Sequence, residues 1–137
     1  MSRYFSLLLF IGLVFWSCDD ENDNNDTIPP SIQILYPLDA DDNTIVLTDN
    51  TIIDVEAYDN ESIHRVEFYI KKSFPICFAC PDTLVYTDFD APFSFYWDIY
   101  DFECGKHTLK AIAYDSSDNS SSALNHYILD QVINIPC

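Results

Sequence analysis

The sequence predicts an all-β fold, a sandwich of about seven antiparallel strands. Three observations lead to this prediction. Short runs of alternating, β-branched or aromatic residues recur along the chain. Clusters of Asp, Asn, Ser and Pro separate these runs, as is typical of turns. No stretch has the hydrophobic spacing of a convincing helix. Seven such strands favour two packed sheets.

The first 17 residues have the features of an export signal. Arg3 precedes an apolar run of about 13 residues, Tyr4 to Trp16, which is short for the roughly 20 residues of a membrane-spanning helix. A cysteine directly after Ser17 resembles a bacterial lipoprotein signal peptide. The resemblance implies that Cys18 is acylated and anchors the protein to a membrane through lipid. The two residues before Ser17 are bulkier than this pattern usually has, and an uncleaved signal anchor or an ordinary secretory cleavage are the alternatives.

Residues 18–27 predict a flexible acidic tether. The stretch from Asp19 to Asp26 contains only acidic and amide residues, so it has nothing apolar to bury and its charges repel one another. We expect it to hold the domain away from the bilayer of the cell envelope. An acidic stretch at this position also resembles the surface-export signals of some Gram-negative lipoproteins. That resemblance implies the outer membrane, with the periplasmic or the surface face left open.

Residues 28–137 predict one domain, because about 110 residues suffice for a single core. The chain carries 23 acidic and six basic residues, a formal net charge of -17. Such a charge repels nucleic acid phosphates and anionic lipid surfaces, which excludes nucleic acid as a partner. The partners that we expect are the membrane, through the lipid anchor, and an envelope protein or glycan.

The strands follow from the hydrophobic pattern, and alternation within them predicts which side chains face inward. In chain order the strands are Ser31 to Tyr36, Thr51 to Tyr58, His64 to Lys71, Thr83 to Thr87, Pro92 to Asp98, His107 to Tyr114 and Ala123 to Ile128, with a short extra piece at Thr44 to Leu47. The inward faces are Ile53, Val55 and Ala57; Val66, Phe68 and Ile70; Phe93, Phe95 and Trp97; and Leu109, Ala111 and Ala113. Two such faces, stacked about 10 Å apart, form the core.

Four of these segments resemble the bacterial immunoglobulin-like domains of extracellular and cell-wall proteins. They are Pro30 to Ile34, Val66 to Ile70, Ala91 to Asp98 and Gly105 to Asp115. The resemblance spans about residues 28 to 130 and implies an immunoglobulin-like β-sandwich that serves as a spacer or binding platform. The chain departs from the family in two ways: the turn after Lys72 is enlarged by roughly ten residues, and four additional cysteines are present.

Those cysteines are Cys77, Cys80, Cys104 and Cys137, an even number in an exported chain, which favours disulfides. If successive strands alternate in direction, all four lie at the end of the sandwich opposite the tether. Spacing leaves three pairings open. We favour Cys104 with Cys137 and Cys77 with Cys80, and the former closes a loop of about 34 residues, which contributes roughly 3 to 4 kcal/mol in the chain-entropy model. A zinc site that adds His107 and a redox pair at Cys77 and Cys80 are the alternatives.

Acidic residues follow three strands at the opposite end, close to the tether. Oxygen ligands from several loops suit Ca²⁺, which takes six to eight of them. Asp and Asn are also the residues that build turns, so a calcium site is the alternative to no cofactor. The candidate ligands are Asp59, Glu61, Asp88, Asp90, Asp115 and Asp118.

The sequence shows no sign of an enzyme. It contains three His, none of them next to a Ser or Cys in a nucleophile setting, and two Gly, so phosphate-binding loops are absent. Tyr69 and Tyr114 occupy outward strand positions and predict a ligand face for sugar or protein. We expect a non-catalytic, lipid-anchored interaction or accessory module of the cell envelope. The alternative is a carbohydrate-binding surface lipoprotein associated with glycan uptake.

Overall fold

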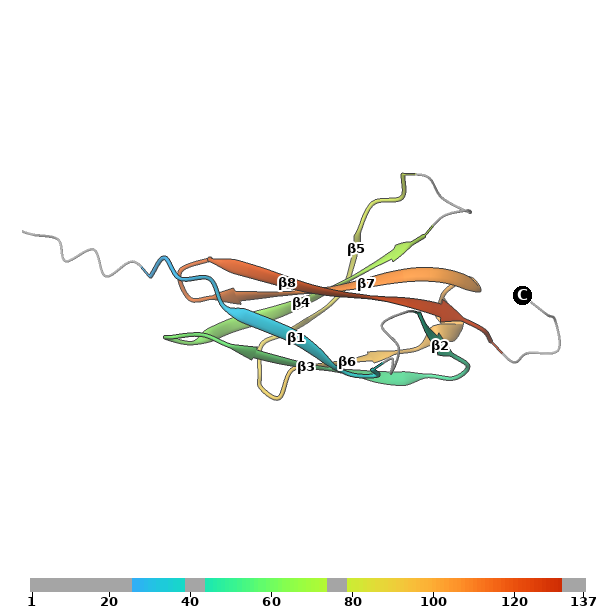
Figure 1. Ribbon diagram of the computed structural model, residues 1–137, viewed down its shortest axis with the longest axis horizontal. Helices are drawn as coiled ribbons and strands as arrows, with labels where there is room; N and C mark the ends of the chain where they lie inside the picture. The colour runs from blue at the N-terminus through green and yellow to red at the C-terminus, as the bar shows by residue number, and fades with distance from the viewer. Residues whose placement is uncertain (1–25, 39–43, 74–78, 132–137) are drawn as a thin grey trace, which may run out of the picture.

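The computed structural model describes residues 26–38, 44–73 and 79–131. This part of the chain contains eight strands and one short 3-10 turn, η1 (Figure 1). Their bounds are β1 Ser31–Tyr36, β2 Ile45–Leu47, β3 Thr51–Tyr58, β4 Ile63–Lys72, β5 Thr83–Asp88, β6 Ser94–Trp97, η1 Ile99–Asp101, β7 Gly105–Asp115 and β8 Ser120–Leu129.

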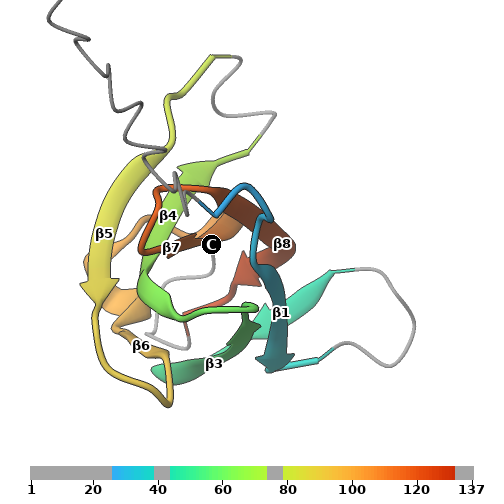
Figure 2. The ribbon, with the colours of Figure 1, turned by 90° about the vertical axis from the view of Figure 1, so that its left-hand side faces the viewer.

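The strands form two sheets that pack face to face, as the end-on view in Figure 2 shows. One sheet has three strands in the order β1-β3-β6, and the other has five in the order β2-β8-β7-β4-β5. Every pair is antiparallel except β2 with β8, which is parallel. The predicted all-β sandwich is therefore confirmed, and the short piece expected before Leu47 is a strand of the larger sheet.

The predicted strand positions agree with the structure, and the largest difference in length occurs in β8. β7 and β8 pair without interruption from Gly105 opposite Leu129 to Tyr114 opposite Ser120. This pairing extends β8 into Ser120–Ser122, which the hydrophobic pattern does not mark as strand. Pairing of the two strands along a hairpin satisfies the hydrogen bonds of the backbone N–H and C=O groups whatever the side chains are. The polar segment therefore becomes part of the sheet.

The core lies between the sheets and consists of the predicted inward faces. Val66, Phe68, Trp97 and Leu109 are fully buried, whereas Ala57, at the end of its strand, is only partly buried. Alternation did not identify several further core residues: Ile34, Leu47, Ile99, Tyr127 and Leu129.

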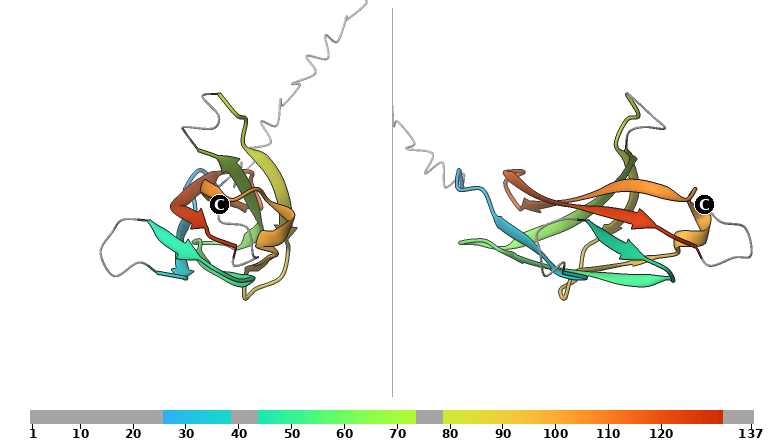
Figure 3. Two further views of the ribbon diagram at one scale, coloured as in Figure 1. Left: turned by 90° about the vertical axis from the view of Figure 1, so that its right-hand side faces the viewer. Right: turned by 45° about the vertical axis from the view of Figure 1, so that its right-hand side comes forward.

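The chain enters the sandwich at one end, where the β3–β4, β5–β6 and β7–β8 connections also lie (Figure 1). A ring contact between His64, at the start of β4, and Phe89, in the β5–β6 connection, has its centroids 6.1 Å apart. Asn119 Nδ2 donates a 2.8 Å hydrogen bond to the backbone oxygen of Asp26. We call this end the N-terminal pole. The end of β4 and the start of β5 stand away from the sandwich (Figure 3). Within the described residues, no helix is both long and apolar enough to cross a membrane.

Candidate functional site

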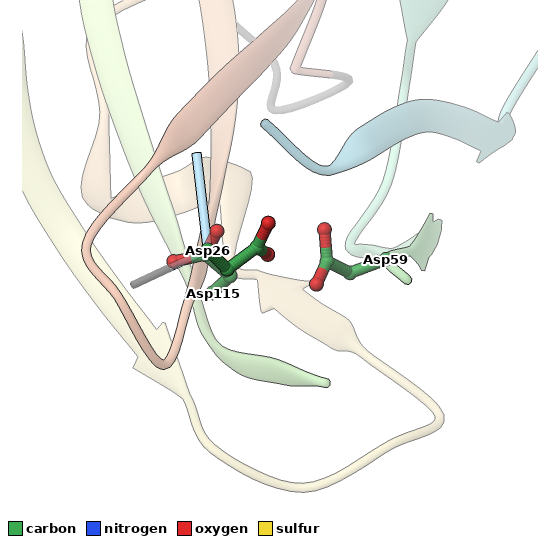
Figure 4. Close-up of side chains that lie close together, drawn as sticks. All are labelled: Asp26, Asp59 and Asp115. Carbon is green, nitrogen blue, oxygen red and sulfur yellow. The ribbon is translucent and has the colours of Figure 1, made fainter. Parts of the chain in front are cut away.

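Three aspartates meet at the N-terminal pole, and each belongs to a different segment of the chain. Asp26 precedes β1, Asp59 follows β3, and Asp115 is the last residue of β7. One carboxylate oxygen from each lies within 4.8 Å of the others (Figure 4). Figure 4 shows Asp59 across from Asp26 and Asp115. This group, which we call the aspartate cluster, offers three oxygen ligands that can hold a metal ion.

Asp115 organises the turn between β7 and β8. Its side chain is 1% exposed, and its Oδ1 accepts hydrogen bonds from the backbone N–H of Ser117 at 2.7 Å and of Asn119 at 2.9 Å. Its Oδ2 accepts a third bond, 2.7 Å long, from Asn119 Nδ2. Burial alone would raise the pKa of Asp115, but the hydrogen bonds from Asn119 and Ser117 outweigh it and lower the pKa below the ordinary value. Asp115 is therefore a carboxylate held in place by neutral donors.

Asp26 and Asp59 each have one satisfied and one unsatisfied oxygen. The backbone N–H of Ile28 donates to Asp26 Oδ1 at 3.0 Å, and the backbone N–H of Glu61 donates to Asp59 Oδ2 at 3.0 Å. The remaining oxygens, Asp26 Oδ2 and Asp59 Oδ1, are shielded from solvent and have no hydrogen-bond partner in the described part of the chain. A buried carboxylate oxygen without a donor costs free energy.

The structure brings together two of the six predicted calcium ligands, Asp59 and Asp115, and places the other four outside the aspartate cluster. Asp88 accepts hydrogen bonds from the backbone N–H groups of Asp90 and Ser94, and so shapes the turn before β6. Asp118 has a φ of 64° at the β7–β8 turn and contacts Arg65. Glu61 and Asp90 are exposed. Asp88 and Asp118 therefore have the turn-building role that was the alternative interpretation.

Asp26 is the one residue of the aspartate cluster that the sequence did not predict as a ligand. It is the last acidic residue of the stretch assigned to the flexible tether, and nothing in its spacing distinguishes it from its neighbours. The structure places it against the β7–β8 turn, where the backbone oxygen of Asp26 accepts the bond from Asn119. The only sequence signal is its position immediately before the first strand.

The opposite end of the molecule, which we call the distal pole, holds Cys80 and the connection that leads to Cys104. A pocket of about 290 Å³ lies between the end of β4, the start of β5 and the η1–β7 connection, and its lining includes Cys80, Phe102, Glu103 and His107. The expectation that these two loops share one end is therefore confirmed. Cys77 and Cys137 lie outside the described residues, as Cys18 does, so the disulfide pairing and the lipidation stay predictions. Neither Cys80 nor Cys104 is without a partner.

His107 is buried at this pole, in contact with aromatic side chains. It is 3% exposed, its Nδ1 lies 3.1 Å from the Gly105 carbonyl oxygen, and its ring contacts Trp97 and Phe102 edge to face. Burial lowers the pKa of His107, which favours the neutral ring. Among the described residues, the aspartate cluster is the only group of His, Cys, Asp and Glu close enough to share a metal ion.

Tyr69 and Tyr114, the predicted ligand face, lie on the outer surface of the larger sheet and are both engaged with neighbouring charges. The Arg65 guanidinium lies 3.9 Å from the centroid of the Tyr114 ring, and Lys110 Nζ lies 5.5 Å from that of Tyr69. Tyr69 also donates a 2.7 Å hydrogen bond to Glu67, which raises the pKa of Tyr69 to about 12. Both rings are partly buried.

Comparison with known proteins identifies the type of domain. Residues 30–111 match the model of a family described as bacterial Ig domain. Among solved structures, the chain is similar to fibronectin(III)-like modules of Clostridium thermocellum CbhA, with a TM-score of 0.57 and 20% sequence identity over 76% of this chain and 48% of that one. It is also similar to the endo-beta-1,4-mannanase from Thermotoga petrophila, with a TM-score of 0.54 and 8% identity over 80% of this chain and 22% of that one.

These two structural likenesses concern the fold alone, because both identities are low. The chain spans about half of the fibronectin(III)-like chain and about a fifth of the mannanase chain. No curated protein matches the sequence.

Proposed function

Because the chain belongs to the bacterial Ig domain family, we propose that it is a non-catalytic interaction or accessory module of the cell envelope, anchored through lipid on Cys18. The observation that carries this proposal is the family match, which covers residues 30–111. Domains of this type are typically non-catalytic and belong to extracellular or envelope-associated proteins, where they act as spacers and binding platforms. The proposal attributes the same role to this chain.

The position of the N-terminal pole supports an anchored arrangement. The chain enters the sandwich at this pole (Figure 1). The pocket beside Cys80 lies at the distal pole. A lipid on Cys18, followed by a short acidic tether, therefore holds the N-terminal pole nearest the membrane. The distal pole then points away from it and is the end most accessible to a partner.

Replacing the acylated cysteine tests the anchor. The full chain and its Cys18→Ala variant are expressed in a bacterium that processes lipoproteins, labelled with radioactive palmitate and fractionated. We expect the unaltered chain to carry label and to sediment with membranes, and the variant to lose the label. Ser6→Ala, inside the apolar run, is the matched control and keeps both properties. Label that persists in Cys18→Ala contradicts the proposed anchor, and protease added to intact cells distinguishes the surface from the periplasmic face.

Carbohydrate binding is the second candidate function, and its specific support is the outward position of Tyr69 and Tyr114. Aromatic faces stack on sugar rings, but each ring here already has a cation over one face, from Lys110 and Arg65 respectively. A glycan array tests this candidate. Binding that is lost in Tyr69→Ala and Tyr114→Ala, and kept in a Tyr96→Ala control from the other sheet, supports it. Binding to no glycan, or loss in the Tyr96 control alone, contradicts this ligand face.

A further inference from the structure

We propose that the aspartate cluster, Asp26, Asp59 and Asp115, binds a divalent cation, and that Ca²⁺ fits it best. The bound cation connects the start of the domain to the β3–β4 loop and the β7–β8 turn. This inference is independent of the proposed envelope function. Of the six calcium ligands expected from the sequence, the proposed site keeps two, Asp59 and Asp115. It adds Asp26, which the sequence assigns to the acidic tether.

The unsatisfied oxygens are the first reason to expect a cation rather than an incidental group of acids. Asp26 Oδ2 and Asp59 Oδ1 are excluded from solvent and accept no hydrogen bond from a described residue. The donors that do serve the cluster are neutral backbone and amide N–H groups. None of the ion pairs formed within the described ranges includes a member of the cluster. The described part of the chain therefore supplies no positively charged side chain to these carboxylates.

Like charges held close together and shielded from water are costly, and either a proton or a cation relieves the repulsion. Asp115 favours the cation, because its three hydrogen-bond donors stabilise the charged carboxylate and its side chain is 1% exposed. The position of Asp115 is therefore fixed before any ion binds. Asp26 and Asp59 lie across from one another beside it (Figure 4).

The ligand type and the spacing of the three carboxylate oxygens favour Ca²⁺. Oxygen ligands suit the hard cations Ca²⁺ and Mg²⁺, which bind oxygen at about 2.3–2.6 Å and about 2.0–2.1 Å respectively. The three oxygens lie within 4.8 Å of one another, so a cation at their centre is at most about 2.8 Å from each, and the Ca²⁺–oxygen distance needs less side-chain movement than the shorter Mg²⁺–oxygen distance. Water completes the six to eight ligands that Ca²⁺ takes.

The consequence of binding is a more firmly attached N-terminus. Without a cation, the backbone oxygen of Asp26 is held to the β7–β8 turn by the 2.8 Å bond from Asn119. A shared cation adds bonds from Asp26 to Asp59 and Asp115, and thereby links three segments that are far apart in sequence. Extracellular calcium modules bind with dissociation constants of about 10⁻⁴–10⁻³ M, and we expect an affinity in that range.

Thermal unfolding and calorimetric titration of the purified full chain test the proposal. The chain is stripped with EGTA, and its Tm is compared in CaCl₂, in MgCl₂ and in NaCl of equal ionic strength. We expect Ca²⁺ to raise the Tm by several degrees more than NaCl does, and Mg²⁺ to raise it less than Ca²⁺. An equal Tm in CaCl₂ and NaCl overturns the proposal.

Asp26→Asn is the decisive variant, because Asp26 lies outside every strand and its change leaves the β7–β8 turn intact. We expect it to weaken Ca²⁺ binding at least about tenfold, and to raise the Tm in EGTA by removing one like charge. Asp90→Asn, at an exposed acidic residue outside the cluster, is the matched control and keeps the Ca²⁺ response. Equal Ca²⁺ responses in Asp26→Asn and Asp90→Asn overturn the site. A Tm gain in EGTA together with an unchanged Ca²⁺ response in Asp26→Asn also overturns it, since the cluster then binds a proton instead.

Discussion

At the scale of single residues, Tyr127 shows how a polar atom can lie in the core without a partner. Its side chain is fully buried against Trp97, with ring centroids 5.2 Å apart. Its hydroxyl makes no hydrogen bond of normal geometry to a described residue. Burial raises the pKa of Tyr127 to about 12, and the nearby Asn125 side chain acts in the opposite direction. The ring therefore fills the core, while the hydroxyl is removed from water without a well-formed hydrogen bond to a described residue.

We therefore expect Tyr127→Phe to leave the free energy of unfolding unchanged or to raise it by up to about 1 kcal/mol, because it removes a desolvated group and keeps the ring. Tyr127→Ala is the contrasting change and costs about 3–5 kcal/mol, since it opens a cavity. Urea unfolding followed by Trp97 fluorescence measures both. A loss of more than about 1 kcal/mol in Tyr127→Phe contradicts the expectation and assigns the hydroxyl a partner.

The ionisation of Glu67 makes the free energy of unfolding depend on pH. Its carboxylate accepts hydrogen bonds from Arg65 Nε at 2.8 Å and from the Tyr69 hydroxyl at 2.7 Å. Burial alone would raise the pKa of Glu67, but these bonds outweigh it and lower the pKa below the ordinary value. A carboxyl group whose folded pKa is depressed stabilises the protein above its unfolded pKa. This contribution is lost as the pH falls through the folded pKa.

We predict that Glu67→Gln lowers the free energy of unfolding at pH 7, and that the difference from the unaltered chain shrinks as the pH falls below about 4.3, the ordinary pKa of Glu. Urea unfolding at intervals from pH 7 to pH 3 measures this convergence. Glu61→Gln, an exposed change on a loop, serves as the control and keeps the slope of the unaltered chain. Parallel curves for Glu67→Gln and the unaltered chain contradict the assigned role.

At the scale of elements, periodicity predicts strands that have one buried and one exposed face. β1 and β3 begin and end where the sequence predicts, because their side chains alternate between core and solvent. The sequence predicts β2 only as a short extra piece, because three residues are too few to show an alternating hydrophobic pattern. The parallel pairing of β2 with β8 also depends on residues that are distant in the sequence. Gly105 begins β7 with a φ of 111°, which favours glycine, yet a single glycine does not say on which side of it the strand lies.

The candidate site is predictable from the sequence only in part, for a similar reason. Asp59 and Asp115 come directly after strands that the sequence predicts, so the topology of a sandwich brings them to one end and the sequence predicts their meeting. Asp26 lies in a segment without periodicity, and its place in the cluster depends on a tertiary hydrogen bond from Asn119. Such a bond leaves no trace in composition or spacing.

The cysteines beyond the signal segment carry the disulfide prediction. The pocket at the distal pole places Cys80 near the connection that contains Cys104, whereas Cys77 and Cys137 lie outside the described residues. We predict that the exported full chain resists alkylation without reduction and has an intact mass lower by one hydrogen per paired cysteine. Peptide mapping is expected to find Cys104 with Cys137 and Cys77 with Cys80.

We expect the two predicted disulfides to contribute different amounts to the free energy of unfolding. Cys104→Ser with Cys137→Ser opens a loop of about 34 residues and should lower the free energy of unfolding by roughly 3 to 4 kcal/mol. Cys77→Ser with Cys80→Ser opens a loop of only a few residues and should lower it less, which makes this pair the matched control. Four alkylated thiols in the exported chain, or equal losses in the two double variants, contradict this pairing.

At the scale of the whole molecule, charge is distributed unevenly. The chain has a net charge of -17, and all basic residues of the described part lie on two adjacent strands of the larger sheet, β4 and β7. These residues are Arg65, Lys71, Lys72, Lys106 and Lys110. Several pair locally, as Lys72 does with Glu103 and Lys110 with Asp82. The acidic residues far outnumber the basic ones, and their mutual repulsion opposes the compact state.

This repulsion predicts that monovalent salt alone stabilises the protein. The screening length falls from about 30 Å at 0.01 M to about 10 Å at 0.1 M salt, so most repulsion between distant carboxylates is removed over that range, whereas short ion pairs such as Arg65 with Glu67 lose less. We expect the Tm to rise with NaCl from 0.01 M to 0.5 M, and calorimetry in the presence of EGTA measures the rise without any contribution from divalent cations.

A charge-reduced variant separates screening from a general effect of salt. Asp54→Asn, Asp90→Asn and Asp130→Asn together remove three exposed carboxylates that form no ion pair among the described residues. We expect the triple variant to have a higher Tm than the unaltered chain at 0.01 M NaCl and a smaller gain on going to 0.5 M. A Tm that falls with NaCl would show that local ion pairs dominate over the net charge. Equal salt gains in the two proteins would assign the effect to apolar burial instead, because salt that strengthens burial acts without regard to surface carboxylates.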